Sequence, residues 1–244
     1  MKSRQFAALV GLLLSTSTLF GQSNPQFAKA NQEYAAGDFD AAANDYEELV
    51  RSRQDTPNLF YNLGNAYFRK KDFGRAILNY ERALALDPHH PEAQANLRIA
   101  RDDARALELL PTRVQRVFAA ATPSQYAVTA AIAFWVGAVA IVAAIFRRNR
   151  RGNLIALSIL AMSILAVSCF AIWEREKNSS ALAVITADSA DARLATADTA
   201  NRVLTLPAGS EIQVLSQRGD WIYAMLPNNL RGWLPSKTAE QVRM

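Results

Sequence analysis

The sequence contains few of the residues that build metal sites, disulfides or catalytic triads. It has one cysteine, Cys169, and two adjacent histidines, His89 and His90. A single cysteine excludes an intramolecular disulfide and a cysteine-built zinc site, and two histidines without a third ligand do not form a metal site. The sequence also lacks a glycine-rich phosphate loop. We therefore expect a protein that is not an enzyme and that needs no cofactor and no metal.

Acidic residues are absent from residues 126–173, and charge is distributed unevenly along the rest of the chain. Residues 24–110 carry 11 basic and 14 acidic side chains, whereas residues 181–244 carry six of each sign. The net charge of +5 comes from the N-terminal 23 residues, from residues 111–125 and from an arginine cluster at 147–151. Phosphate binding needs a basic surface on a folded region, so this distribution excludes nucleic acid as a partner.

The first of three apolar runs lies near the N-terminus. Lys2 and Arg4 precede an apolar stretch from Phe6 to Phe20, and small and polar residues follow it. The run is shorter than the roughly 20 residues that span a bilayer. This layout is typical of a secretory signal peptide, which we place at residues 1–23; an uncleaved anchor is the alternative.

Two longer runs, residues 126–146 and 153–173, each contain 21 residues without a charge. A lipid environment requires each run to be helical, so they predict a transmembrane hairpin joined by the loop 147–152; the alternative is two buried helices of a soluble core. Short basic loops stay in the cytoplasm. The loop therefore predicts a multi-pass protein of the bacterial inner (cytoplasmic) membrane with both flanking regions outside the cytoplasm. Its arginines are Arg147, Arg148, Arg150 and Arg151.

Small residues recur along the first of these runs at spacings of three and four. Such a stripe favours close packing against a second helix. The stripe consists of Ala133, Gly137, Ala140 and Ala144.

Residues 24–110 repeat themselves at an offset of 34. Asn31, Phe39 and Tyr46 recur as Asn65, Phe73 and Tyr80. The segment PNLFYNLGNAYFRKKDFGRAILNYERALALDP resembles the tetratricopeptide family, whose period is 34 residues. The resemblance implies an all-α domain of two helical repeats, with a capping helix from about Pro91. The residues that carry it are Phe60, Leu63, Gly64, Tyr67, Ala76, Tyr80, Ala83 and Pro88.

The resemblance also implies a groove formed mainly by the first helix of each repeat. Asparagine side chains there could bond a peptide backbone in either direction, and Arg69 could pair with a carboxylate. The alternative is that the aromatic side chains pack between helices and the polar ones are solvated. The predicted groove residues are Phe27, Asn31, Tyr34, Tyr61, Asn65, Phe68 and Arg69.

Residues 181–244 alternate short β-rich runs with turn signals, which is typical of a small sheet or barrel. The segment LPAGSEIQVLSQRGDWIYAMLPNNLRGWLPS resembles bacterial SH3-type domains, through Gly209, Gly219, Asp220, Gly232 and Pro235 together with its two tryptophans. The resemblance implies a small all-β SH3-like barrel. Its rim would include Trp221, Tyr223 and Trp233, which either pack structurally or form a ligand platform.

The order of parts resembles BatE-type proteins of bacterial aerotolerance operons: signal peptide (1–23), repeats (24–110), linker (111–125), hairpin (126–173), linker (174–180) and SH3-like domain (181–244). That resemblance implies an envelope scaffold whose partners include membrane proteins with von Willebrand factor A domains. The alternative function is a cell-wall sensor whose SH3-like domain binds peptidoglycan. The six-residue loop, 147–152, leaves no room for an output domain, which disfavours sensing.

Overall fold

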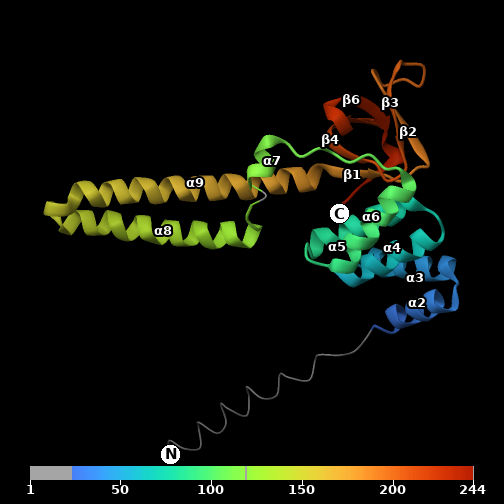
Figure 1. Ribbon diagram of the computed structural model, residues 1–244, viewed down its shortest axis with the longest axis horizontal. Helices are drawn as coiled ribbons and strands as arrows, with labels where there is room; N and C mark the ends of the chain where they lie inside the picture. The colour runs from blue at the N-terminus through green and yellow to red at the C-terminus, as the bar shows by residue number, and fades with distance from the viewer. Residues whose placement is uncertain (1–23, 119, 244) are drawn as a thin grey trace, which may run out of the picture.

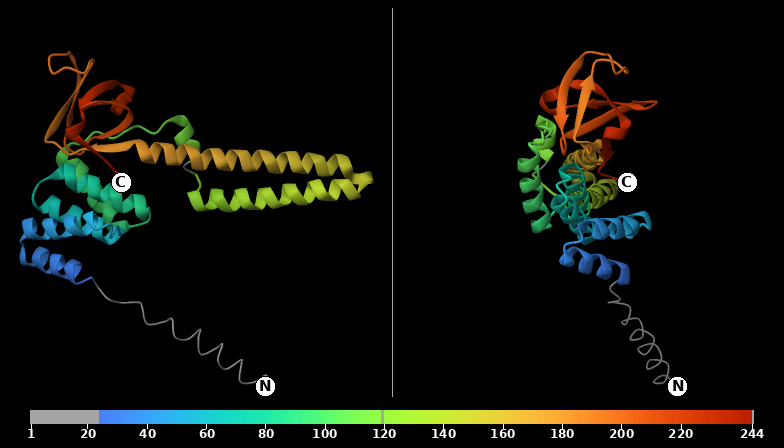
Figure 2. Two further views of the ribbon diagram at one scale, coloured as in Figure 1. Left: turned by 180° about the vertical axis from the view of Figure 1, so that it is seen from behind. Right: turned by 90° about the vertical axis from the view of Figure 1, so that its right-hand side faces the viewer.

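The computed structural model describes residues 24–118 and 120–243, so the predicted signal peptide lies outside the described residues. Two compact units, one helical and one β, lie against each other at one end of a long helical hairpin (Figure 1). The hairpin projects away from both units, as the view from behind also shows (Figure 2). Its bend is therefore the part of the described chain that lies farthest from the two units.

The helical unit consists of antiparallel helix pairs followed by a single helix. Each helix begins at a side chain that accepts a hydrogen bond from the first turn: Asn24, Asp38, Thr56, Asp72 and His90. This capping satisfies backbone N–H groups that would otherwise lack a partner. The helices are α2 (Pro25–Ala36), α3 (Phe39–Arg51), α4 (Pro57–Arg69), α5 (Phe73–Leu86) and α6 (Pro91–Ala104).

The turn between the helices of each pair has the same backbone conformation in both repeats. Gly37 has φ 85°, and Lys71, its equivalent 34 residues later, has φ 63°. Both values are left-handed, a region that glycine adopts without steric cost. The repeat period and the predicted capping helix at Pro91 are confirmed by this arrangement.

Small residues allow the paired helices to approach closely. A Cβ added to Gly64 on α4 would lie 2.7 Å from the ring of Tyr80 on α5. Ala42 and Ala76, equivalent residues of α3 and α5, are fully buried. Gly64 therefore leaves the room that the Tyr80 ring occupies.

The hairpin consists of α8 (Pro123–Phe146), the short 3-10 turn η1 (Arg148–Arg150) and α9 (Arg151–Ala181). Both helices are long and apolar enough to cross a membrane. The predicted small-residue stripe is buried against α9: Ala133, Gly137, Ala140 and Ala144 are the buried residues of α8. A Cβ on Gly137 would lie 3.5 Å from the Ala161 Cβ, while large apolar side chains such as Ile132, Val139 and Ile145 are exposed.

The segments predicted as linkers contain helix. Residues 174–180 continue α9 without a break, because EREKNSS contains neither glycine nor proline and the Asn178 side chain donates to Glu174 Oε1 at 3.1 Å. Residues 111–125 contain the short helix α7 (Arg113–Phe118) and the first residues of α8. The β unit therefore follows the hairpin through a helix.

The C-terminal unit is one antiparallel sheet in the order β3-β2-β6-β5-β4-β1-β7. Among the described strands, β3 and β7 form the two edges and do not pair, so the sheet is open where a closed barrel was expected. Its buried face includes Ile185, Leu206, Ile212 and Leu234. The strands are β1 (Leu182–Ile185), β2 (Ser189–Arg193), β3 (Arg202–Pro207), β4 (Glu211–Arg218), β5 (Trp221–Met225), β6 (Arg231–Pro235) and β7 (Ala239–Gln241).

Candidate functional site

The asparagines predicted to bond a peptide instead join neighbouring helices. Asn31 Oδ1 accepts from the Tyr46 hydroxyl at 2.6 Å and from Asn62 Nδ2 at 2.9 Å. The same network recurs 34 residues later, where Asn65 Oδ1 accepts from Tyr80 at 2.8 Å and from Asn96 Nδ2 at 2.9 Å. Each network links three helices, so the side-chain oxygens of both asparagines serve the repeat itself.

The predicted groove aromatics also contact aromatic rings of adjacent helices, and these contacts repeat. Phe27 lies 5.8 Å from Tyr46, and its equivalent Tyr61 lies 6.2 Å from Tyr80, between ring centroids. Tyr34 and Phe68 make edge contacts with Phe39 and Phe73 at 5.3 and 5.6 Å. The Arg69 guanidinium stacks 4.4 Å above the Phe39 ring. These contacts correspond to the packing alternative for the predicted groove.

Two of the predicted residues, Phe27 and Tyr61, also line an open hollow of about 480 Å³. The hollow is bounded by α2, α4 and the start of α6, and it includes Asn62, His90 and Glu92. His90 Nδ1 accepts from the Ala93 N–H at 3.3 Å, so this histidine caps α6. The sequence analysis missed the part of the hollow formed by Asn58, Asp87 and Glu92, because it treated the third helix only as a cap.

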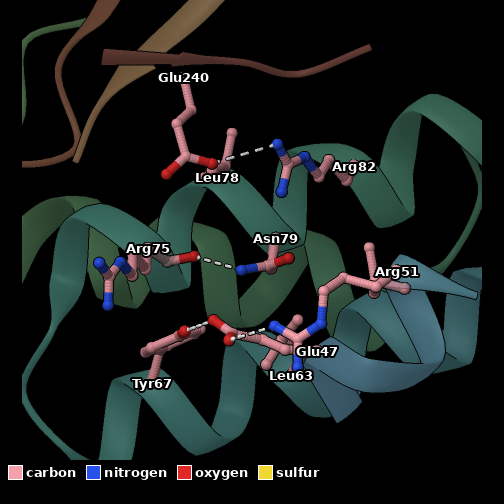
Figure 3. Close-up of a pocket in the computed structure, with 10 residues that line it drawn as sticks. Glu47, Arg51, Leu63, Tyr67, Arg75, Leu78, Asn79, Arg82 and Glu240 are labelled. Atoms are coloured by element: carbon pink, nitrogen blue, oxygen red, sulfur yellow. Dashed lines mark hydrogen bonds and ion pairs between the residues drawn. The ribbon is translucent and has the colours of Figure 1, made fainter. Parts of the chain in front are cut away.

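A second recess, of about 260 Å³, lies between α3, α4, α5 and the C-terminal edge of the β unit. Figure 3 shows Arg51, Arg75 and Arg82 around it, with Glu47 and Glu240 between them. Glu47 pairs with Arg51 at 3.6 Å, and Glu240 pairs with Arg82 at 3.4 Å. Because Glu240 belongs to β7, this recess exists only where the two units meet.

The contact between the two units centres on Arg101 of α6. Its guanidinium pairs with Glu81 of α5 at 2.6 Å, with Glu108 at 3.4 Å and, at short range, with Glu211 of β4. The Arg101, Glu81 and Glu211 side chains are only 14%, 15% and 11% exposed. A buried charge needs such partners, so this cluster, the Arg101 cluster, holds the repeat unit to the β unit.

Backbone hydrogen bonds reinforce the same contact. The Glu211 N–H donates to the Leu107 carbonyl at 2.9 Å, and the Leu107 N–H donates to Ser210 Oγ at 3.1 Å. On the other side of α5, Arg82 donates to the Gln241 carbonyl at 3.0 Å. Val184 and Val242 of the β unit are buried in the same apolar cluster as the repeat core. The two units therefore share a core.

Glycine permits the close approach of α5 to the β unit. A Cβ on Gly74 would lie 2.8 Å from the carbonyl oxygen of Ile185 and 3.0 Å from the Thr186 Cα. Gly209, at φ 79°, lies against the Ile77 side chain with no room for a Cβ. Both glycines thus belong to the interface as well as to their own units.

Burial raises the pKa of Glu81 to about 7, and the neighbouring Glu211 carboxylate acts in the same direction, while Arg101 opposes them. The folded protein therefore holds a proton that the unfolded chain, with a carboxyl pKa near 4.5, releases. We predict that stability falls as pH rises from about 4.5 to about 7. Thermal denaturation of the full chain in detergent should show this decline, and Glu81→Gln should reduce it; an unchanged pH dependence in the variant would contradict the prediction.

The three predicted rim aromatics lie on one face of the sheet and are half-buried. Tyr223 and Trp233 are cross-strand partners in β5 and β6, with ring centroids 5.0 Å apart. Trp221 lies two residues before Tyr223 on the same face, opposite Pro235. Ile222 and Leu234, which alternate with them, point into the core. The aromatics are thus outside the core of the β unit.

The four predicted topology arginines lie together at the bend of the hairpin. Arg147 ends α8, Arg148 and Arg150 are in η1, and Arg151 begins α9. All four are exposed. They mark the end of the hairpin opposite the two units (Figure 1).

Comparison with known proteins supports one of the expected families. A search of curated proteins found no match to the chain. A tetratricopeptide repeat family model matches residues 27–91, which span α2 to α5 and reach the first residue of α6. The matched region has the helix pairs and the 34-residue periodicity described above. This chain therefore contains tetratricopeptide repeats, which are protein-interaction modules.

Proposed function

We propose that the chain is a non-enzymatic, membrane-anchored scaffold that presents its repeat unit and its β unit together on the outer side of a bacterial inner membrane. The observation that carries the proposal is the position of both units, packed on one another, at the end of the hairpin opposite four arginines. Basic short loops stay in the cytoplasm. The hairpin would then anchor one rigid binding body outside it.

The hollow between α2, α4 and α6 is the proposed protein-binding surface. Its half-buried aromatic residues offer apolar area, and the exposed Asn58 and Glu92 at its margin offer polar contacts. Interfaces commonly combine an aromatic centre with a polar rim. By resemblance to the aerotolerance family, the proposed partners are envelope proteins, including membrane proteins with von Willebrand factor A domains, within a stress-related complex.

Affinity purification of the full chain from membranes in mild detergent tests this proposal. We expect an integral membrane partner to co-purify, and Glu92→Arg in the hollow to reduce its recovery. Glu48→Arg, at an exposed position of α3, is the matched control and should leave recovery unchanged. Equal recovery with all three proteins, or no membrane partner at all, would contradict the scaffold role.

A cell-wall sensor is the second candidate function, favoured by the half-exposed aromatic face of Trp221, Tyr223 and Trp233. In this proposal the β unit is an SH3-like domain that binds peptidoglycan through that face. Purified sacculi should retain the wild-type chain and should lose it after Trp233→Ala. Retention of neither protein removes the sensor and leaves the scaffold proposal intact.

A further inference from the structure

The hairpin end that faces the two units carries a collar, which we define as residues 110–118 and 173–177. Its helix, α7, is fixed to both long helices through Phe118. The Phe118 carbonyl accepts from Arg175 of α9 at 2.9 Å and from the Tyr126 hydroxyl of α8 at 3.3 Å. The Phe118 ring also contacts Phe170, at 5.8 Å between centroids. The collar therefore has a set position beside the last apolar turn of the hairpin.

Large apolar side chains of the collar are exposed. Leu110 is 67% exposed, Val117 is 68% exposed and Trp173 is 56% exposed, and Val114 lies on the same face of α7 as Val117. These side chains continue the exposed apolar surface of the hairpin, which includes Phe170. Contiguous exposed apolar surface marks an interaction site.

Basic side chains accompany this apolar surface. Arg113 and Arg116, three residues apart, share a second face of α7 next to the valines. On α9, the Lys177 ammonium lies 5.2 Å from the Trp173 ring centre. An amphipathic helix with basic residues on one face and apolar residues on the next is typical of a segment that lies in a membrane interface.

Acidic side chains in the collar do not cancel this charge. Glu176 is paired with Arg243 of the β unit, and Glu174 accepts from Asn178. The basic residues outnumber the acidic ones, so the collar is positive where it adjoins the apolar hairpin. Its charged residues are Arg113, Arg116, Arg175 and Lys177 against Glu174 and Glu176.

We propose that the collar binds anionic phospholipid headgroups. Val114 and Val117 would enter the boundary between headgroups and acyl chains, and Arg113 and Arg116 would pair with lipid phosphates. The charges are complementary, and the apolar face is continuous with the surface that the hairpin would present to lipid. The inference rests on the proposed membrane anchoring, and it adds a preference for lipid charge that anchoring alone does not require.

Hydrogen exchange of the full chain in nanodiscs tests the proposal. We expect α7 amides to exchange about tenfold more slowly in discs that contain phosphatidylglycerol than in discs of phosphatidylcholine alone, since each basic residue near an anionic surface contributes. Added salt should reduce the difference. The double variant Arg113→Gln/Arg116→Gln should abolish it, whereas Arg98→Gln, an exposed position of α6, should not.

The outcomes separate this proposal from the anchoring itself. A chain that enters both kinds of disc but shows equal α7 exchange in them overturns the lipid preference and leaves the anchor intact. A double variant that keeps the wild-type difference also overturns it. A chain that does not co-elute with any disc overturns the membrane anchoring, and with it the collar proposal.

Discussion

Replacement of Arg101 by alanine is expected to separate the repeat unit from the β unit and to lower the stability of the folded body by about 3–5 kcal/mol. The Arg101 guanidinium faces Glu81, Glu108 and Glu211 and is 14% exposed. Its removal leaves buried carboxylates of like charge without a counter-ion. Thermal denaturation of the full chain in mild detergent measures the loss.

Hydrogen exchange locates the effect of Arg101→Ala. The amides of Leu107 and Glu211, which bond across the interface, should lose protection first. Arg98→Ala on the same helix is the control, because Arg98 is exposed and its side chain bonds only within α6, to the Gln94 carbonyl. Equal stability of the Arg101→Ala and Arg98→Ala proteins would show that the cluster does not hold the units together.

Gly74→Ala is expected to destabilise the protein by about 1–3 kcal/mol, as overpacking does. Alanine is otherwise the better helix residue, by about 1 kcal/mol, so an isolated repeat unit should gain stability from the same change. The added Cβ would meet backbone atoms of Ile185 and Thr186 in the β unit, which cannot move unless the units part. The sign of the effect therefore reports whether α5 and β1 are in contact.

Thermal denaturation gives that sign, and Gly152→Ala in α9 is the matched control. A Cβ at Gly152 meets nothing within 4 Å, so alanine there should be neutral or stabilising. Gly74→Val should be worse than Gly74→Ala, because it adds more volume at the same point. A stabilised Gly74→Ala protein would contradict the shared interface.

The repeat helices could be predicted because local signals and periodicity agree at each position. Gly37 and Lys71 occupy equivalent turns, and Asp38 and Asp72 cap equivalent helices. The small-residue stripe of α8 was also predictable, since its spacing alone places Ala133 and Gly137 on one face. These features depend on residues close together in the sequence.

The interface was not predictable in the same way. Arg101 and Glu211 are 110 residues apart, and each has the appearance of an ordinary surface charge in the sequence. The function of Asn31 and Asn65 was misjudged for a related reason: an asparagine on a helix can face a groove or a neighbouring tyrosine, and only the packing of Tyr46 and Tyr80 decides. The open edges of the sheet likewise depend on long-range pairing.

The placement of both units on one side of a membrane is the central claim, and cysteine labelling tests it most directly. In a Cys169→Ser background, His89→Cys, Asn149→Cys and Arg218→Cys place single thiols at exposed positions of the repeat unit, the hairpin bend and the β unit. The account predicts that a membrane-impermeant maleimide labels positions 89 and 218 in intact spheroplasts, and position 149 only after permeabilisation. Labelling of position 149 in intact spheroplasts, or of only one of the other two, would contradict it.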